Sequence, residues 1–531
     1  MLSRQRSLSV ALSFVLILAA SGCSVAFKDK PDSTGTLSLS SAARLCAPCD
    51  STNAATGGGS GTSDDPFLVC SLAQLTHIDT QCATESNWAS KSFLQCADLD
   101  LQGSSGTPST PICHATSFQG SYDGGGKKIT AFYYSNPSQS GVGFIEHLSG
   151  GTVSNLTLVN PTVSGNSQVG SLIGWMDGAA QVVSCSATGV SVTLSGGNGG
   201  GLVGKVQGAS AKIDGATVSG AVTNTGGGFT GGLLGTMVPS PNTSLNYLWN
   251  SSSSVTVTAN ANGSNSVGGL VGYADSGSRV DHSFATGAVV GYGYVGGLAG
   301  FMDSGPGISK VEHSYATGHV TATSIGSGGL IGDMNDCYVR NSHATGDVSG
   351  ADATGGLIGY SSLRWSLGLV STSYATGNVT GHDGVGGLMG DAGIGIDNVY
   401  AIGDVSGHDR VGGLIGVTGD QQYWSGAVIP AVTNAYSKGS VTGNSSVGGL
   451  IGSLGLVVTV GSPTLGNITG TPGVDPLIVV TDSYWDTTTS GQATSDGGTA
   501  KTTALMQTAS TYSTWPIAVW LISGGSYPTL K

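Results

Sequence analysis

VEHSYATGHV, at residues 311–320, precedes SGGLIG at 327–332, and the same two phrases return as VSTSYATGNV at 370–379 and VGGLMG at 385–390. The second phrase, a leucine step flanked by glycines, recurs along most of the chain at a period of roughly thirty residues. A repeat of this kind predicts a stack of similar units. Its leucines are Leu202, Leu233, Leu270, Leu298, Leu330, Leu357, Leu388, Leu414 and Leu450, with GSLIG at 170–174 as a further copy and GVGFIE at 141–146 as a degenerate first one.

The first phrase has the residue types of short β-strands. A β-branched apolar residue stands four positions before the aromatic residue, as Val280 does before Phe284 and Val311 before Tyr315. Short apolar runs bounded by glycine are typical of strands, and the repeats carry no sustained helical period. A unit of two or three short strands cannot bury its own apolar face, whereas stacked units can. We therefore predict an all-β fold, a parallel β-helix (β-solenoid) of about eleven coils, with equivalent residues about 4.8 Å apart.

A polar position lies two residues before the aromatic slot. Asparagine tolerates the left-handed backbone conformation of tight corners, so this position predicts a corner ladder of polar side chains. The alternative is a histidine metal site, but such a site needs three or four convergent ligands, and His343 occupies the aromatic slot instead. We predict no metal site and no cofactor. The corner residues are His282, His313, Asn341, Asn398 and Asn434.

The tyrosines of the aromatic slot have two possible directions. If the strand runs straight from the valine, tyrosine faces the same side and belongs to the core. If the polar residue is a corner, the alternation breaks and the rings line an outer face, which would suit binding of carbohydrate or protein. Partial burial is the favoured interpretation. The candidate ligand-facing aromatics are Tyr315, Tyr374, Tyr400 and Tyr436.

Composition and charge restrict the possible partners. Of 531 residues, 90 are glycine and only 9% are charged, with 18 basic and 31 acidic side chains giving a net charge of −13. Phosphate backbones require clustered lysine and arginine, which this chain does not have, so nucleic acid is excluded as a partner. The hydrophobic share of 39% is sufficient for a buried core.

The N-terminus has the pattern of an export signal. Arg4 and Arg6 precede the short apolar run VALSFVLILAA at 10–20, which ends in ASGC at 20–23. ASGC resembles the lipobox of bacterial lipoproteins, with Ala20 where that family usually has leucine. The resemblance implies a signal peptide over 1–22, acylation at Cys23 and, because Ser24 follows, a lipid anchor in the outer membrane. An ordinary secretory signal is the alternative. The Ser- and Gly-rich segment 23–60 predicts a flexible tether.

Six cysteines are concentrated in the N-terminal part, where export allows disulfides to persist. Six cysteines permit fifteen pairings, and the sequence does not choose among them. CAPC at 46–49 lies in a Ser- and Gly-rich segment, which favours structural disulfides over a redox-active dithiol. Cys185 and Cys337 lie five coils apart, roughly 24 Å, and are predicted not to pair. The disulfide candidates are Cys46, Cys49, Cys70, Cys82, Cys96 and Cys113.

GGLIG alternating with SYATGxV resembles the GLUG repeat of bacterial surface proteins, which occurs in filamentous-haemagglutinin-like adhesins and beside the protease domain of IgA-specific metallopeptidases. FQGSYDGGGKKI at 118–129 and DSYWDTTTSG at 482–491 resemble the usual flanking segments. The resemblance implies a parallel β-helix and a role at the bacterial surface, most often adhesion. We accordingly divide the chain into a Cys-rich N-terminal β cap (61–140), a repeat β-helix (141–455) and a closing segment (456–531).

Signatures of catalysis are sparse. Neither HExxH nor GxSxG occurs, and GYGYVG at 291–296 is a chance match in so glycine-rich a chain. Polysaccharide lyases and hydrolases need paired carboxylates, for which Asp383 with Asp391, and Asp409 with Arg410, are the only weak candidates. We therefore expect no enzyme and no catalytic residue, but a lipid-anchored, adhesin-like rod at the cell surface that binds glycans or proteins. A β-helix carbohydrate-active enzyme and a passive spacer are the alternatives.

Overall fold

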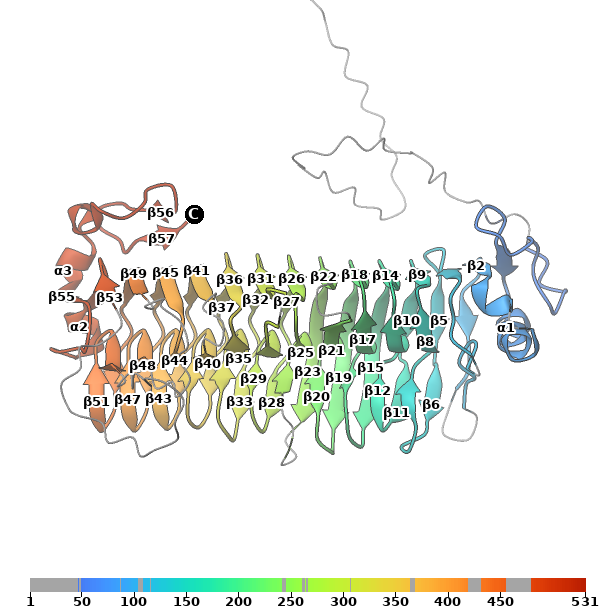
Figure 1. The fold of residues 1–531 in the computed structure, drawn as a ribbon, viewed down its shortest axis with the longest axis horizontal. Helices are drawn as coiled ribbons and strands as arrows, with labels where there is room; N and C mark the ends of the chain where they lie inside the picture. The colour runs from blue at the N-terminus through green and yellow to red at the C-terminus, as the bar shows by residue number, and fades with distance from the viewer. Residues whose placement is uncertain are drawn as a thin grey trace, which may run out of the picture. The chain divides into compact units, whose positions relative to one another are not determined.

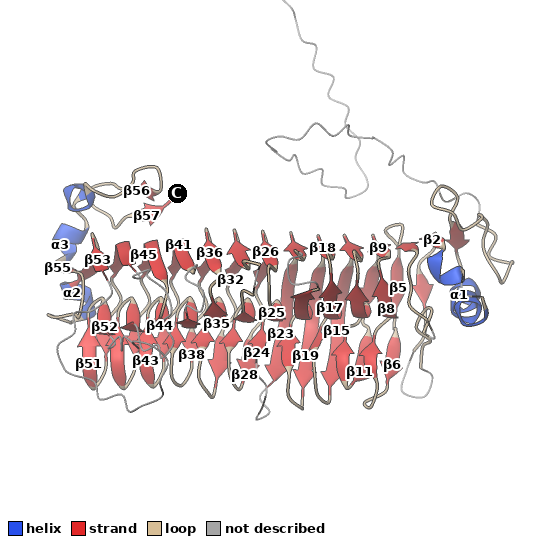
Figure 2. Cartoon of the chain, viewed as in Figure 1, coloured by secondary structure: helices blue, strands red, loops and turns tan. Residues whose placement is uncertain are grey.

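The computed structural model of the chain describes residues 46–531, apart from residues 47–48, 86, 104–107, 115, 241–244, 260–262, 264–265, 306, 363–367, 419–430 and 455–478. The described repeats form coils of short parallel strands that lie side by side in Figure 1 and appear in red in Figure 2. One sheet of 33 strands and two sheets of 11 strands each make the sides of these coils. The parallel β-solenoid predicted from the repeat is confirmed.

Adjacent coils match strand for strand. One coil contains β24 (Ser266–Gly268), β25 (Val271–Ala274), β26 (Arg279–Asp281), β27 (Phe284–Ala285) and β28 (Val289–Gly291). The next contains β29 (Val295–Gly296), β30 (Ala299–Met302), β31 (Lys310–Glu312), β32 (Tyr315–Ala316) and β33 (Val320–Ala322). Val280 pairs with Val311 and Phe284 with Tyr315. In-register parallel pairing thus places the same residue of each phrase beside its equivalent, which explains the repetition.

The leucines of the glycine-flanked step form a column inside the solenoid. Each is fully buried, and successive backbones are hydrogen bonded, with Leu298 N–H donating to Leu330 O and Leu330 N–H to Leu357 O, both at 2.8 Å. The glycine before the step leaves no room for a side chain. A Cβ atom at Gly328 would lie 1.9 Å from the carbonyl oxygen of Ile331 and 2.7 Å from the amide nitrogen of Gly359 on the next coil.

The polar corner is confirmed by backbone geometry. His282 and His313 have φ of 48°, and Asn398 has φ of 54°, all in the left-handed region. This reverses the side-chain alternation, so that Val280 and the residues on either side of Phe284 face the core while the ring of Phe284 lies outside. Where a serine follows the corner, it is buried and donates its hydroxyl to a carbonyl two residues back; Ser283 does so at 2.9 Å. Cys185 occupies this serine slot, as predicted, and its thiol donates a hydrogen bond to the carbonyl of Val183.

The N-terminal segment contains a helix that the prediction of a β cap did not include. Helix α1 (Leu72–Thr84) begins after Ser71, whose hydroxyl accepts the amide N–H of Gln74, and its buried face carries Leu75 and Ile78 into the core. It lies between β1 (Phe67–Val69) and β2 (Ser92–Gln95), which pair in parallel. Parallel pairing then continues through β5 (Lys128–Thr130) to β10 (Thr157–Val159), so the solenoid begins before residue 141.

All six N-terminal cysteines are paired, as Cys46–Cys96, Cys49–Cys70 and Cys82–Cys113. CAPC is therefore a structural element, because its two cysteines join different partners. Cys185 and Cys337 are free and buried, which confirms that they do not pair with each other.

The C-terminal segment covers the last coil. Trp485, in β54 (Tyr484–Asp486), lies on Gly449, where a Cβ atom would be 2.0 Å from the indole ring. Helices α2 (Thr487–Ser490) and α3 (Thr503–Met506) follow, and then the antiparallel pair β56 (Trp520–Leu521) and β57 (Thr529–Leu530). Cys23 and the signal segment lie outside the described residues. Within the ranges that are described, none of the helices is both long enough and apolar enough to cross a membrane.

Candidate functional site

Six aromatic rings form a continuous stack on the outside of the solenoid, which we call the aromatic ladder. Neighbouring ring centroids are 4.7 to 5.2 Å apart, and neighbouring planes differ by 1 to 12°. The spacing is that of parallel strands, because each ring extends from the equivalent position of successive coils. The ladder consists of Phe284, Tyr315, His343, Tyr374, Tyr400 and Tyr436.

Burial increases along the ladder toward the C-terminus. Tyr315, in β32, and Tyr374, in β41 (Leu369–Ala375), are half-buried and keep part of their rings on the surface. These two remain candidates for ligand contact. Burial raises the pKa of Tyr374 and lowers the pKa of His343, which favours the neutral form of each side chain.

Tyr400 and Tyr436 do not face a ligand, which corrects the prediction for these two residues. Their exposed fractions are 8% and 2%, because the C-terminal segment packs over them. The Trp520 indole N–H donates to the Asn398 side-chain oxygen at 2.7 Å, and the Tyr436 hydroxyl donates to the Pro528 carbonyl at 2.8 Å. The prediction could not include this cover, since the covering residues lie outside the repeat.

His343 gives the ladder a pH dependence that can be measured. Its folded pKa is lowered by burial, so below the unfolded value of about 6.5 the unfolded chain binds a proton that the folded chain resists. The stabilisation is complete above that value and is lost as pH falls toward the folded pKa. We expect wild type to lose more stability than His343→Tyr between about pH 7 and pH 5, measured by denaturant titration. Identical slopes for the two proteins would contradict the assignment.

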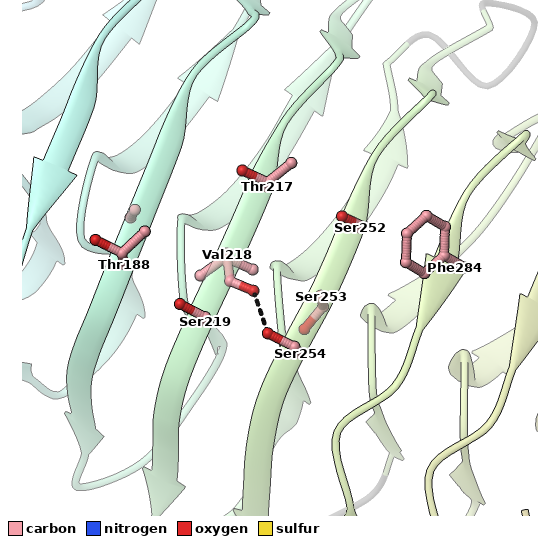
Figure 3. A pocket seen from close by; sticks show the side chains of 9 residues that line it. Thr188, Thr217, Val218, Ser219, Ser252, Ser253, Ser254 and Phe284 are labelled. Carbon is pink, nitrogen blue, oxygen red and sulfur yellow. Dashed lines mark hydrogen bonds between the residues drawn. The ribbon is translucent and has the colours of Figure 1, made fainter. Parts of the chain in front are cut away.

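A hollow adjoins the Phe284 end of the ladder. The positions in register with Phe284 on the three preceding coils are Ser252, Thr217 and Ser186, all of them small. They leave a space of about 230 Å³ over β15 (Ser186–Leu194), β19 (Thr217–Asn224) and β23 (Ser252–Ala259). Figure 3 shows Phe284 beside Ser252 with hydroxyl side chains on the adjoining strands. The lining residues are Ala187, Thr188, Thr217, Val218, Ser219, Ser252, Ser253, Ser254 and Phe284.

The hollow combines an aromatic ring with hydroxyl groups and has no charged side chain in its lining. Serine and threonine hydroxyls both donate and accept hydrogen bonds, and the face of Phe284 offers apolar stacking. Sequence reasoning missed this site, because Thr217 and Ser252 lie in coils whose phrases depart from SYATG. An alignment of those coils on their leucine steps could have found it, because it would show small residues in the place of the aromatic one.

Two groups of histidine and aspartate lie on corners of the solenoid. Asp281 Oδ1 is 2.8 Å from His282 Nδ1 and 3.1 Å from His313 Nδ1. In the second group, His382 and His408 stack with planes 5° apart, each with Nδ1 about 3.5 Å from Asp383 Oδ1. Nitrogen lone pairs lie in the ring plane, so stacked parallel rings do not direct them to one point, as a metal ion requires. We interpret both groups as corner support between coils.

Ser117, His147 and Asp177 form a hydrogen-bonded chain that the sequence search did not find. Ser117 Oγ is 2.6 Å from His147 Nδ1, and His147 Nε2 is 3.0 Å from Asp177 Oδ2. A Ser-His-Asp hydrolase uses the opposite nitrogens, with the carboxylate on Nδ1. The imidazole also lies flat on Trp175, at 4.1 Å between centroids. Ser117, His147 and Asp177 are spaced thirty residues apart, which is one coil each, and this equal spacing could have indicated the chain in the sequence.

The fold separates the two carboxylates of the first candidate pair, Asp383 and Asp391. Asp383 lies in β43 (Asp383–Gly386), whereas Asp391 is buried in β44 (Met389–Ala392) of a different sheet. Asp409 accepts the Ser445 hydroxyl at 2.6 Å and the Arg410 amide N–H at 2.9 Å, and the Ser445 hydrogen bond is the main cause of its lowered pKa. Asp409 is the first residue of β47 (Asp409–Gly412), and these contacts tie it to its own strand and to the next coil.

Comparison with known proteins identifies the repeat. Residues 263–290 match the family described as the GLUG motif. Halomucin from Haloquadratum walsbyi is 32% identical over 139 residues, which are 24% of this chain and 2% of halomucin. A solved structure titled IgA1 Protease is similar over 53% of this chain and 21% of its own, at 19% identity and a TM-score of 0.36. A putative immunoglobulin A1 protease from Bacteroides ovatus is similar over 89% and 94% of the two chains, at 15% identity and a TM-score of 0.26.

Proposed function

We propose that this GLUG-motif β-solenoid is an adhesin-like rod that binds glycans or proteins at the cell surface. The observation that carries the proposal is the aromatic ladder with its adjoining hollow, on the outer face of a continuous parallel frame. Aromatic rings that are fixed before binding give contact area at a low cost in conformational entropy. A stacked frame holds Phe284, Tyr315 and Tyr374 in this way, since neighbouring rings and the strands beneath restrict them.

The proposed location is the cell envelope, with a lipid anchor at Cys23 in the outer membrane. The three disulfides support export, because disulfides persist outside reducing compartments. We expect labelled palmitate to be incorporated into the wild-type chain and not into Cys23→Ala. Membrane fractionation should move the variant from the membrane pellet to the soluble fraction. Equal labelling of both proteins would remove the anchor from the proposal.

Binding is tested with the full chain, solubilised in detergent, on arrays of glycans and of proteins. The proposal requires saturable binding to at least one of them, and loss of that binding after unfolding and disulfide reduction. The absence of saturable binding on both arrays would favour a passive spacer.

The competing function is a carbohydrate-active enzyme. Its candidate site is the chain of Ser117, His147 and Asp177, in which the two ring nitrogens are used in the reverse of the Ser-His-Asp hydrolase arrangement. Incubation with a panel of polysaccharides separates the two functions. A binding rod releases no new reducing or unsaturated ends. Sustained release that is lost in His147→Gln would make the protein an enzyme.

A further inference from the structure

The aromatic ladder is covered at one end and open at the other. At the C-terminal end, the chain supplies its own cover: the Trp520 ring lies 6.1 Å from Tyr400 and 6.2 Å from Tyr436. At the other end, Phe284 has Tyr315 on one side at 4.8 Å, and on the other side the hollow above Ser252. The ladder therefore ends on a half-buried ring that borders an open space.

The dimensions of the hollow suit one more ring. A further member of the ladder would be centred about one strand spacing, roughly 4.8 Å, beyond Phe284, in the place that the short side chain of Ser252 leaves empty. The volume of about 230 Å³ is below the range of roughly 300–1,000 Å³ typical of pockets for drug-sized ligands. The space therefore accommodates a single six-membered ring with its substituents.

The chemistry of the lining narrows the class of ring. The floor and rim present the hydroxyls of Thr188, Thr217, Ser219, Ser252 and Ser254, as Figure 3 shows. A pyranose has a face of C–H groups and a rim of hydroxyls, which matches an aromatic face beside a field of hydroxyl donors and acceptors. A uronic or sialic acid would bring a carboxylate against a lining with no cationic side chain, at a desolvation cost. An aromatic side chain of a protein would stack on Phe284 but offer at most one polar group to these hydroxyls.

We infer that the hollow beside Phe284 is a subsite for one neutral pyranose ring of a glycan, which stacks on Phe284 and continues the aromatic ladder. This inference rests on the proposed binding function and specifies its ligand class. Phe284 supplies the stacking face, and the hydroxyls of Thr217, Ser219 and Ser252 bind the rim of the sugar. The rest of the glycan extends along or away from the solenoid.

The test uses two substitutions, one that fills the hollow with an aromatic side chain and one that removes the stacking ring. Ser252→Tyr places an aromatic side chain at the next position of the ladder, and Phe284→Ala removes the stacking face. Neutral oligosaccharides of glucose, galactose, mannose, xylose and N-acetylglucosamine, with a uronic-acid oligosaccharide for comparison, are titrated into the full chain by calorimetry and saturation-transfer NMR. We expect at least one neutral sugar to bind, and each variant to weaken that binding by about tenfold or more.

Phe301→Ala is the matched control, because it removes a half-buried phenylalanine ring from β30, in a different sheet from Phe284, and should leave the affinity unchanged. Circular dichroism verifies that each variant is folded. The subsite is overturned if no neutral sugar binds, if only the acidic sugar binds, or if both variants bind as wild type does. If the wild-type chain binds a tryptophan-containing peptide and Ser252→Tyr does not, the hollow is assigned to a protein side chain instead. Binding on the protein array without sugar binding removes the subsite alone, whereas no binding on either array removes the proposed function as well.

Discussion

Replacing Gly328 with alanine is expected to lower the free energy of unfolding by about 3 kcal/mol or more. The added Cβ atom would lie 1.9 Å from the Ile331 carbonyl oxygen and 2.7 Å from the Gly359 amide nitrogen. Both are backbone atoms, so no side chain can rotate out of the way. The turn between Gly328 and Ile331 must deform, and the coil that contains Gly359 must move away. Separation breaks the hydrogen bond from Leu330 N–H to Leu357 O and opens the leucine column.

The measurement is a urea titration followed by tryptophan fluorescence, together with hydrogen exchange of residues 327–359. Both are needed because stacked repeats can unfold in parts rather than as one unit. Gly524→Ala is the control, since a Cβ atom there has no neighbour within 4 Å. If Gly328→Ala were as stable and as protected as the control, close approach of backbone atoms would not be the reason for this glycine.

The features that every coil shares could be predicted from the sequence. Stacked strands place equivalent residues together, so a leucine repeated at one step must form a column, and this needed no knowledge of the loops between steps. The corner followed from residue type, because asparagine accepts the left-handed backbone, and Asn341 and Asn434 adopt it at φ of 49° and 51°. The sequence left two directions open for the tyrosines, inward on a straight strand and outward after a corner. The observed φ values decide that the rings lie outside.

The features that occur once could not be predicted. The cover over Tyr436 comes from Pro528 and its neighbours, 92 residues away, and the closing segment shows no periodicity that would place it. The disulfide partners depend on how the N-terminal segment folds around α1, which residue spacing alone does not determine. The hollow exists because Ser252 stands where the following coils carry an aromatic ring. It could be found only once the structure showed which residues of these coils of unequal length are paired.

Trp520→Ala is expected to lower the free energy of unfolding by about 3 to 5 kcal/mol. The side chain is 1% exposed, packs against Trp515 at 4.5 Å between centroids, and donates its indole N–H to Asn398 at 2.7 Å. Its removal leaves a cavity over the last two rings of the ladder and takes the donor from a buried amide oxygen, which adds a desolvation cost. Thermal and urea unfolding measure the loss.

The same substitution should change the titration of the ladder. Burial raises the pKa of Tyr400 and of Tyr436, so the folded chain resists their ionisation and loses stability as pH rises above the ordinary tyrosine value of about 10. Without Trp520, water reaches both rings, and we expect their pKa values to fall toward that ordinary value in a tyrosinate absorbance titration. Leu521→Ala is the control from the same strand, because Leu521 is 58% exposed. If the two variants titrate alike, then the C-terminal segment does not shield the ladder, and Tyr400 and Tyr436 return to the set of surfaces available to a ligand.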